Sequence, residues 1–212
     1  MARNSRGPRT PVTGGTRRKR NTQPQSQTTG ADSSIIRYSA IGQTMATAPS
    51  TSYCNMVRGY VPGLDANLET GTGPTIVGFY ATGKFLPGTR IRWEPNVSFT
   101  TSGRIYVGFI DNPEVMSTIL ATSGTAFGAA VRGLGSVISF PVWQETDIPF
   151  PTKLRRKMFD TNSTPTTNVD QLDRSAQVYM FAYADGCPAD TSLGSFWYHD
   201  VVAVEGIHAE ST

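Results

Sequence analysis

The sequence is poor in the residues that most enzymes use for catalysis. It contains only two histidines and two cysteines among 212 residues. It has none of the HExxH, paired CxxC, GxSxG or GxxxxGKS/T patterns that mark zinc proteases, zinc or redox sites, serine hydrolases and phosphate-binding loops. The glycine-rich run at 128–135 lacks the lysine and the hydroxyl residue of a phosphate-binding loop. We therefore expect a protein that is not an enzyme and requires no cofactor.

Long apolar runs are also absent. No stretch approaches the roughly 18 apolar residues of a membrane-spanning helix, so we expect no membrane partner. The polar N-terminus lacks the apolar core of a secretory signal. Outside the secretory route, Cys54 and Cys187 are best explained as two reduced thiols of a cytosolic protein. The sequence indicates no role for either thiol.

Acidic residues are missing from the beginning of the chain. Residues 1–31 carry seven basic side chains and no acid, and the first acid is Asp32. The other 12 basic residues face 16 acidic ones, so the charge is +7 before Asp32 and −4 from there on. This split predicts a polyanionic partner for the first segment. Its basic residues are Arg3, Arg6, Arg9, Arg17, Arg18, Lys19 and Arg20.

Residues 1–32, called the N-terminal arm below, have almost no apolar surface to bury, so we expect them to be disordered in isolation. A nuclear localisation signal, a membrane-surface segment and a mitochondrial transit peptide are alternatives for such a basic stretch. The arm lacks the Trp, Phe and Leu residues that an interfacial helix buries. Its prolines and glycines also disfavour the amphipathic helix of a transit peptide.

The chemistry of the arm suits single-stranded RNA. Arginine forks match phosphate oxygens, stay charged and stack on bases. Seven phosphate contacts on single-stranded RNA predict a log–log salt slope of about −5 per arm. No aromatic residue precedes Tyr38, so we expect binding that is largely independent of RNA sequence.

After the arm, the chain is rich in Val, Ile, Thr, Tyr and Phe and is interrupted by Gly and Pro, as in proteins with many short strands. Ile91 and Trp93 alternate with polar residues, and the apolar run at 104–110 predicts a strand covered on both faces. The pattern favours an all-β domain of about eight strands in two packed antiparallel sheets. We expect strands at 33–41, 53–61, 75–81, 89–94, 104–110, 177–183 and 195–204.

One or two short helices are expected in the loops. The best candidate runs from Pro113 to about Ser123, with Asp111 or Asn112 as its cap. Residues 121–136 are small and rich in glycine, so we predict a loop there. The three tryptophans, Trp93, Trp143 and Trp197, are expected to pack in the core or at an interface.

Three segments carry a resemblance to a known family. In 93–111, a strand ends at Pro95, a Thr/Ser-rich turn reaches Gly103, and an apolar strand runs to Asp111. This segment resembles the shell domain of tombusvirus- and sobemovirus-like coat proteins. Segments 135–143 and 193–204 resemble, in the same order, the region before the family's fifth strand and its closing strand. The length is similar to that of shell-only coat proteins, including those of ourmiaviruses.

The resemblance implies more than the composition does. It implies an eight-stranded viral jelly roll over residues 33–212, without a protruding domain. Copies of this domain would form a homo-oligomeric icosahedral shell of a plant virus, with the arm pointing inward onto packaged single-stranded RNA. The protein would then be found in the virion and in the host cytoplasm.

A second basic group lies at 153–157. On a strand, Lys153, Arg155 and Lys157 would share one face. They are either a basic inner-wall patch that faces RNA or a solvated face engaged in salt bridges.

Asp111 and Glu114 are candidate calcium ligands. Many members of the family that this chain resembles bind calcium between subunits through aspartates just after the strand that corresponds to 104–110. Oxygen ligands at an interface suit calcium. Where those relatives often have a second aspartate, this chain has Asn112. The alternative is that Asp111 only caps the helix. Glu145 and Asp147 are further acids that an interface could use.

Two other functions are compatible with a basic arm and a β domain. One is a viral nucleic-acid-binding protein that forms no shell, such as a movement protein. The other is a cellular jelly-roll binding module, which would normally enter the secretory route. The formation of closed particles separates a coat protein from both.

Overall fold

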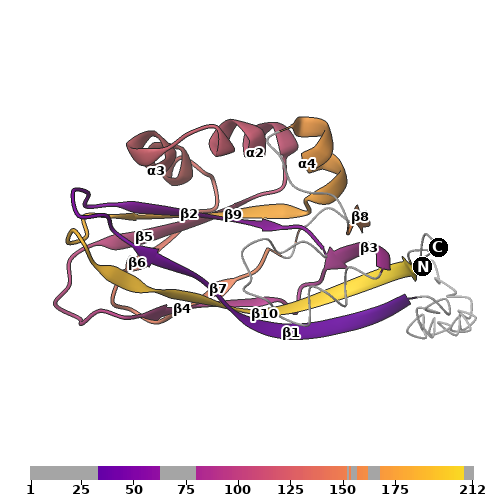
Figure 1. Ribbon diagram of the computed structural model, residues 1–212, viewed down its shortest axis with the longest axis horizontal. Helices are drawn as coiled ribbons and strands as arrows, with labels where there is room; N and C mark the ends of the chain where they lie inside the picture. The colour runs from indigo at the N-terminus through magenta and orange to yellow at the C-terminus, as the bar shows by residue number, and fades with distance from the viewer. Residues whose placement is uncertain (1–32, 63–79, 152, 154–156, 162–167, 208–212) are drawn as a thin grey trace, which may run out of the picture.

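The computed structural model describes residues 33–62, 80–151, 153, 157–161 and 168–207 (Figure 1). Within them the chain forms β1 (Ser33–Ala46), β2 (Cys54–Tyr60), β3 (Tyr80–Phe85), β4 (Arg90–Pro95), β5 (Arg104–Ile110), α2 (Pro113–Leu120), α3 (Gly124–Arg132), β6 (Ile138–Pro141), β7 (Thr146–Pro149), β8 (Phe159–Asp160), α4 (Val169–Ser175), β9 (Val178–Asp185) and β10 (Ser192–Ile207).

The strands form two antiparallel sheets. The six-stranded sheet has the order β7-β4-β10-β3-β8, and β1 also pairs with β10. Since β4 pairs with the first half of β10 and β3 with the second half, β1 runs along the other edge of β10. The four-stranded sheet has the order β2-β9-β5-β6. The prediction of an all-β fold in two antiparallel sheets is confirmed.

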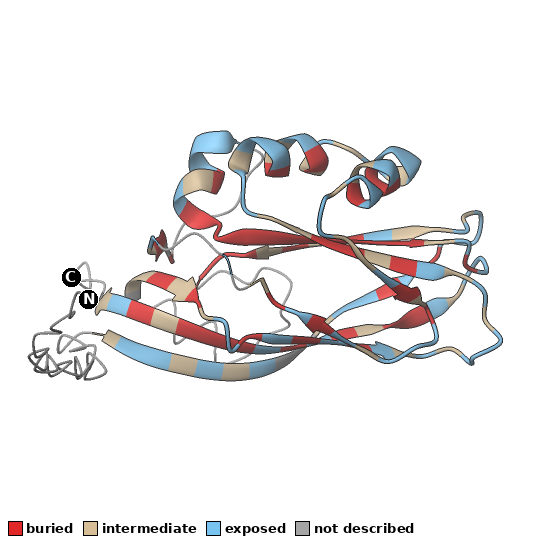
Figure 2. Cartoon of the chain, turned by 180° about the vertical axis from the view of Figure 1, so that it is seen from behind, coloured by how far each residue is buried: buried red, intermediate tan, exposed pale blue. Residues whose placement is uncertain are grey.

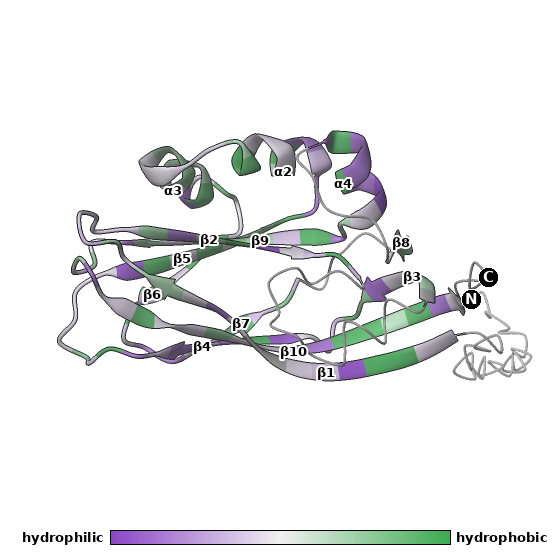
Figure 3. Ribbon diagram, viewed as in Figure 1, coloured by the Kyte–Doolittle hydropathy of each residue, from purple (hydrophilic) through white to green (hydrophobic). Residues whose placement is uncertain are grey.

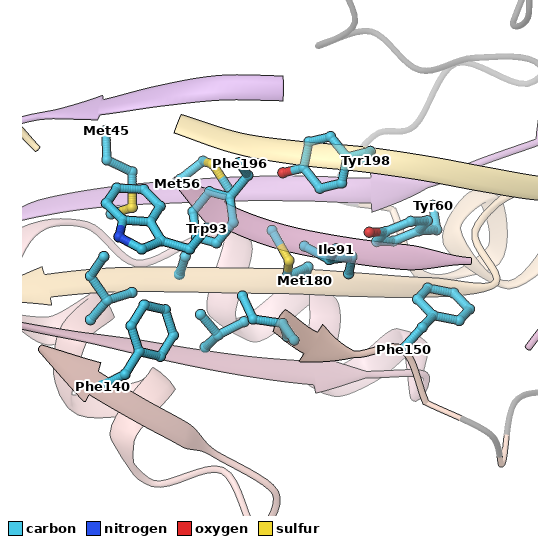
Figure 4. Packing of buried hydrophobic residues seen from close by; sticks show 14 of the residues in the cluster. Met45, Met56, Tyr60, Ile91, Trp93, Phe140, Phe150, Met180, Phe196 and Tyr198 are labelled. Carbon is cyan, nitrogen blue, oxygen red and sulfur yellow. The ribbon is translucent and has the colours of Figure 1, made fainter. Parts of the chain in front are cut away.

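The molecule has three layers (Figure 1): the six-stranded sheet, the four-stranded sheet, and the helices over the outer face of the four-stranded sheet. One apolar cluster, which includes Trp93, Phe196 and Met180, fills the space between the sheets (Figure 4). A second cluster, which includes Phe127 and Phe181, lies between helices and sheet. Apolar burial of this kind is the main favourable term in folding.

Strands β5 and β9 are covered on both faces, as the apolar run at 104–110 predicted. Ile105 and Val107 belong to the cluster between the sheets, whereas Tyr106 packs against the cluster under the helices. In β9 every residue from Val178 to Ala184 is buried (Figure 2). Because both faces of these strands are covered, apolar side chains are needed at odd and even positions alike. This explains why apolar and polar residues do not alternate along β5 and β9.

The six-stranded sheet alternates instead, because its outer face is not covered by helices. In β4, Ile91 and Trp93 are buried and Arg90 and Arg92 are exposed. The indole Nε1 of Trp93 donates a 2.9 Å hydrogen bond to the carbonyl of Val142, so this buried polar atom has a partner. Figure 3 shows hydrophilic residues interrupting the hydrophobic ones along β1 and β10.

Helix α2 confirms the predicted short helix, and its hydrogen bonds show which residue is the N-cap. The side chain of Asn112 accepts hydrogen bonds from the backbone amides of Glu114 and Val115, at 2.9 and 3.3 Å, and Pro113 is the first helical residue. Asn112, rather than Asp111, is therefore the N-cap.

The prediction of a loop at 121–136 is wrong, because α3 occupies most of it. Phe127 and Val131 lie about one helical turn apart and are buried in the cluster under the helices. Gly128 lies on the same face, directly against the ring of Tyr183. A glycine there allows the close approach of helix and sheet, so packing outweighs the low helix propensity of glycine.

Besides α3, four short elements were not predicted from the sequence, namely β6, β7, β8 and α4. Only the end of the strand expected at 75–81 can be compared with the structure, because 75–79 lie outside the described residues. Strand β3 begins at Tyr80. The other predicted strands are confirmed within a few residues of their ends. Of the three tryptophans, Trp93 is in the core, whereas Trp143 and Trp197 are 39% and 38% exposed.

We predict that Gly128→Ala destabilises the protein although alanine is the better helix former. The new Cβ would meet the ring of Tyr183, which is itself stacked on Tyr53. Overpacking of a core contact costs about 1–3 kcal/mol. The measurement is urea unfolding followed by circular dichroism.

Gly135→Ala is the matched control, because no atom lies within 4 Å of the Cβ position at Gly135. The unfolding midpoint of Gly135→Ala should stay close to that of the wild type. A Gly128→Ala variant that is as stable as the wild type would contradict the packing of α3 on β9.

Candidate nucleic-acid and metal-binding residues

The arm lies outside the described residues, and with it all seven of its basic side chains. The structure does show where the arm joins the domain. Ser33, the first residue of β1, pairs with Glu205 near the end of β10. The arm therefore joins the edge strand of the six-stranded sheet, beside the last strand (Figure 1).

The second basic group is only partly described. Arg155 lies outside the described residues, and Lys153 and Lys157 lie in bends rather than on a strand. The Nζ of Lys157 is 2.7 Å from a carboxylate oxygen of Asp173 and 5.3 Å from the centre of the Phe159 ring. A role of Lys153, Arg155 and Lys157 in RNA binding stays a prediction, and Lys157 would have to leave Asp173 to fulfil it.

The two candidate calcium ligands flank Asn112. Glu114 borders a groove between the beginnings of α2 and α4, which Asp170 and Asp173 also line. Within the described part of the chain, no three His, Cys, Asp or Glu side chains are grouped so that they could hold a metal ion. Calcium takes about six to eight oxygen ligands, so the described residues of one chain do not complete this site. Calcium binding by Asp111 and Glu114 stays a prediction that requires ligands from a second copy.

Glu145 and Asp147 are engaged within the chain. The guanidinium of Arg92 lies 3.1 Å from Glu145 and 2.8 Å from Asp147. The hydrogen bond from Arg92 holds the pKa of the Asp147 carboxyl below its usual value. The side chains of Arg92, Glu145 and Asp147 are 49%, 61% and 75% exposed. Exposed ion pairs of this kind contribute little to stability.

The two sheets are joined by a buried ion pair. Arg58 on β2 and Asp200 on β10 approach to 2.6 Å, and their side chains are 2% and 1% exposed. Removing two charges from water is costly, so such a pair persists only where the partners meet closely. The pair therefore fixes how the four-stranded sheet lies against the six-stranded sheet.

Two tyrosines support the buried arginine. The guanidinium carbon of Arg58 lies 3.4 Å from the centre of the Tyr198 ring and 4.5 Å from that of Tyr60. Both rings point into the space between the sheets (Figure 4). A cation over an aromatic face is stabilised by the ring quadrupole, most strongly where water is excluded. Burial raises the pKa of the Asp200 carboxyl, and the charge of Arg58 opposes this shift.

Sequence reasoning missed this pair, although a signal for it exists. In β2, Arg58 has the same parity as the buried residues Met56 and Tyr60. In β10, Asp200 has the same parity as Tyr198 and Val202, which are also buried. Two opposite charges at core-facing positions of two strands could therefore have indicated an ion pair between the sheets.

Both cysteines are free thiols, as the sequence predicted. Burial raises the pKa of the Cys54 thiol to about 12 and that of the Cys187 thiol to about 11. Almost no thiolate exists at neutral pH under these conditions, and the thiolate is the reactive form.

The fold of this chain matches solved structures of several viruses. The fold matches a structure of Tobacco necrosis virus with a TM-score of 0.64 and 15% identity, over 84% of this chain and 98% of that one. It matches Cocksfoot mottle virus with a TM-score of 0.58 and 18% identity, over 82% and 93%. It matches Mud crab tombus-like virus with a TM-score of 0.63 and 13% identity, over 88% and 96%. No family model and no curated protein matches the sequence.

The chain therefore has the jelly-roll fold of the capsid subunits of small RNA viruses. This confirms the fold that the resemblance of 93–111, 135–143 and 193–204 implied. Since the similarity covers nearly the whole length of the matched chains, it concerns the complete shell domain rather than a single sheet. No helix in the described part of the chain has the length and the apolar character needed to cross a membrane.

We predict that Asp200→Asn destabilises the protein by about 3–5 kcal/mol, because it leaves the charge of Arg58 buried without its counter-ion. Urea unfolding measures this loss. Asp147→Asn is the matched control: it removes the carboxylate of an exposed Arg92 pair, so the unfolding midpoint should hardly change.

A double variant, Arg58→Met with Asp200→Leu, distinguishes the ion pair from simple packing. Replacing both charges by apolar groups should recover much of the stability lost in Asp200→Asn. If the double variant is less stable than Asp200→Asn, the loss comes from packing and not from an unpaired charge.

We also predict that neither thiol reacts quickly with Ellman's reagent in the native protein at neutral pH. The raised pKa values of Cys54 and Cys187 leave almost no thiolate. Unfolding in guanidinium should release both thiols at once and serves as the control. Rapid labelling of one thiol in the native state would show that its end of the barrel opens.

Proposed function

We propose that this chain is a structural capsid protein that self-assembles into a non-enveloped icosahedral shell and packages single-stranded RNA through its N-terminal arm. The observation that carries the proposal is the fold: two antiparallel sheets whose arrangement matches virus structures over nearly the whole length of the matched chains. The chain has no enzymatic role in this proposal. It acts in the virion, and it is made and assembled in the host cytoplasm.

The position of the arm supports the packaging role. It precedes β1, which is an edge strand, so the arm can extend away from the barrel without crossing either sheet. It carries seven positive charges and no acid before Asp32, while the rest of the chain has a net charge of −4. A polyanion is therefore attracted to the arm and not to the domain as a whole.

The mechanism of packaging is electrostatic. Each arm displaces counter-ions from the phosphates and binds weakly, with an expected log–log salt slope of about −5. A shell holds many arms around one RNA, so the effective concentration of each arm near the RNA is high. Affinity then comes from the number of copies, and binding does not require a specific RNA sequence.

We predict that deletion of residues 2–20 abolishes or randomises RNA packaging and leaves the barrel folded. The deleted segment holds all seven basic residues of the arm. Negative-stain electron microscopy and the ratio of absorbance at 260 and 280 nm, measured on the same fractions, report shells and RNA separately. Circular dichroism reports the fold.

The matched control keeps the charge of the arm and exchanges its basic residue types: each arginine of the arm is replaced by lysine, and Lys19 is replaced by arginine. Packaging should persist in this variant if charge governs it. Unchanged packaging after deletion of 2–20 would refute the role of the arm. A wild-type chain that binds RNA but never forms closed particles would instead indicate a non-assembling nucleic-acid-binding protein of the movement-protein type.

A further inference from the structure

The outer face of the six-stranded sheet has features that the arm does not explain. Along β10, the residues Phe196, Tyr198, Asp200 and Val202 point to the core, so the residues between them point away from it. Val201 is the exception in exposure, because it is only 7% exposed and lies beside the loop that holds Gly88. Two of these outward residues are Trp197 and His199. The side chain of Trp197 is 38% exposed, so its indole is accessible to a ligand on this face.

Trp197 and His199 line a groove of about 320 Å³ between β1, β10, β4 and β7. Ser39 on β1 bonds Nδ1 of His199 at 2.7 Å, which fixes the ring and leaves Nε2 for a ligand. Arg90 lies opposite His199 in the ladder, and Arg92 lies opposite Trp197. The groove thus combines an aromatic face with hydrogen-bond donors.

Three cations lie along this face. Arg90, Arg37 and Lys84 lie beside successive outward positions of β10, at His199, Val201 and Ala203. None of the three forms an ion pair or a side-chain hydrogen bond within the described ranges, whereas Arg92 is occupied by Glu145 and Asp147. Outward positions on a strand repeat at roughly 7 Å, so the cations form a row.

Acidic residues are placed at the two ends of this row. Glu94 lies at the far edge of the groove, beside Ser195, and Glu205 lies where β1 begins. Asp147 also borders the groove, but Arg92 binds it. Asp147 also interacts with the charge of Arg90, so it offsets the positive charge of the described outward face between Trp197 and Ala203 only in part.

The row is continuous with the arm. It leads from Trp197 along β10 to the point where Ser33 pairs with Glu205, which is where the arm enters the sheet. Only six residues of β1, roughly 20 Å of strand, separate Ser33 from Ser39 in the groove. An RNA strand that lies along this face therefore also passes close to the point where the arm joins β1.

We propose that the outer face of β10, from Trp197 to Ala203, is a binding track for single-stranded RNA. Trp197 stacks on an unpaired base, and Arg90, Arg37 and Lys84 bind phosphates along the strand. An aromatic platform combined with cations that follow the backbone is the usual way to bind a single strand without reading its sequence. The inference rests on the proposed function, and it adds an aromatic stacking contact that the arm, which has no aromatic residue, cannot supply.

The first test uses ultraviolet cross-linking of RNA-filled wild-type particles, followed by mass spectrometry. Trp143 is the internal control, because it is as exposed as Trp197 but lies outside the groove. Cross-links at Trp197 and none at Trp143 are expected. Cross-links confined to the arm would leave the packaging function intact and overturn the track. Particles without any RNA would overturn both.

The second test measures the affinity of the full-length chain for a fluorescein-labelled single-stranded RNA of about ten nucleotides. Loss of one stacked base corresponds to about a 5- to 150-fold weaker affinity for Trp197→Ala. Trp143→Ala should bind like the wild type, and Trp197→Phe should keep part of the affinity. Equal affinities of Trp197→Ala and the wild type would overturn the proposal.

The cations have their own control. The triple variant Arg37→Gln, Lys84→Gln, Arg90→Gln should reduce the steepness of the salt dependence by about 2, at about 0.7 per contact. Arg104→Gln removes an exposed arginine from the four-stranded sheet and should leave the salt dependence unchanged. If Trp197→Ala prevents particle formation without changing RNA affinity, the face is an interface between copies of the chain, and the track is refuted.

Discussion

The structure depends on the alternation of side chains along β10. This strand pairs with β1 on one edge and with β4 and β3 on the other, so it connects most of the six-stranded sheet. Its inward residues fill the core, and its outward residues form the surface opposite the helices. A shift of one residue would exchange the two faces, burying His199 and exposing Phe196. Gly194, with a φ of 152° at the bulge between β1 and β10, lies so close to the backbone of Glu94 that no larger residue fits, which helps to hold this register.

The ion pair between Arg58 and Asp200 applies the same constraint to the second sheet. Buried pairs add little net stability compared with apolar packing, but separating them is costly. Any arrangement in which β2 slides against β10 would leave one charge buried alone. The pair thus acts on the choice of arrangement more than on its stability.

The distribution of charge explains why the arm and the domain would contribute differently to RNA binding. The arm has an excess of positive charge and no aromatic residue, which suits contacts of arginine with phosphates and bases but not stacking on an aromatic ring. The domain is acidic in total, yet the acids on its outer face are either bound by Arg92 or placed at the ends of the row. A net charge summed over a domain does not show this separation, because unpaired cations on one face are cancelled by acids elsewhere. The local arrangement, and not the sum, decides where a polyanion binds.

The sequence by itself determined the all-β class, most strand positions, the helix that begins at Pro113, and the charged arm. These features follow from local rules, such as alternation, capping and composition, which act over a few residues. Only the tertiary structure decided that 124–132 is a helix, since Gly128 is favourable there through its contact with Tyr183, which is far away in the sequence. It also decided that Arg58 meets Asp200 and that Trp197, Arg90 and Arg37 share one face. Those contacts join residues more than 50 positions apart, and they depend on strand pairing, which no local pattern specifies.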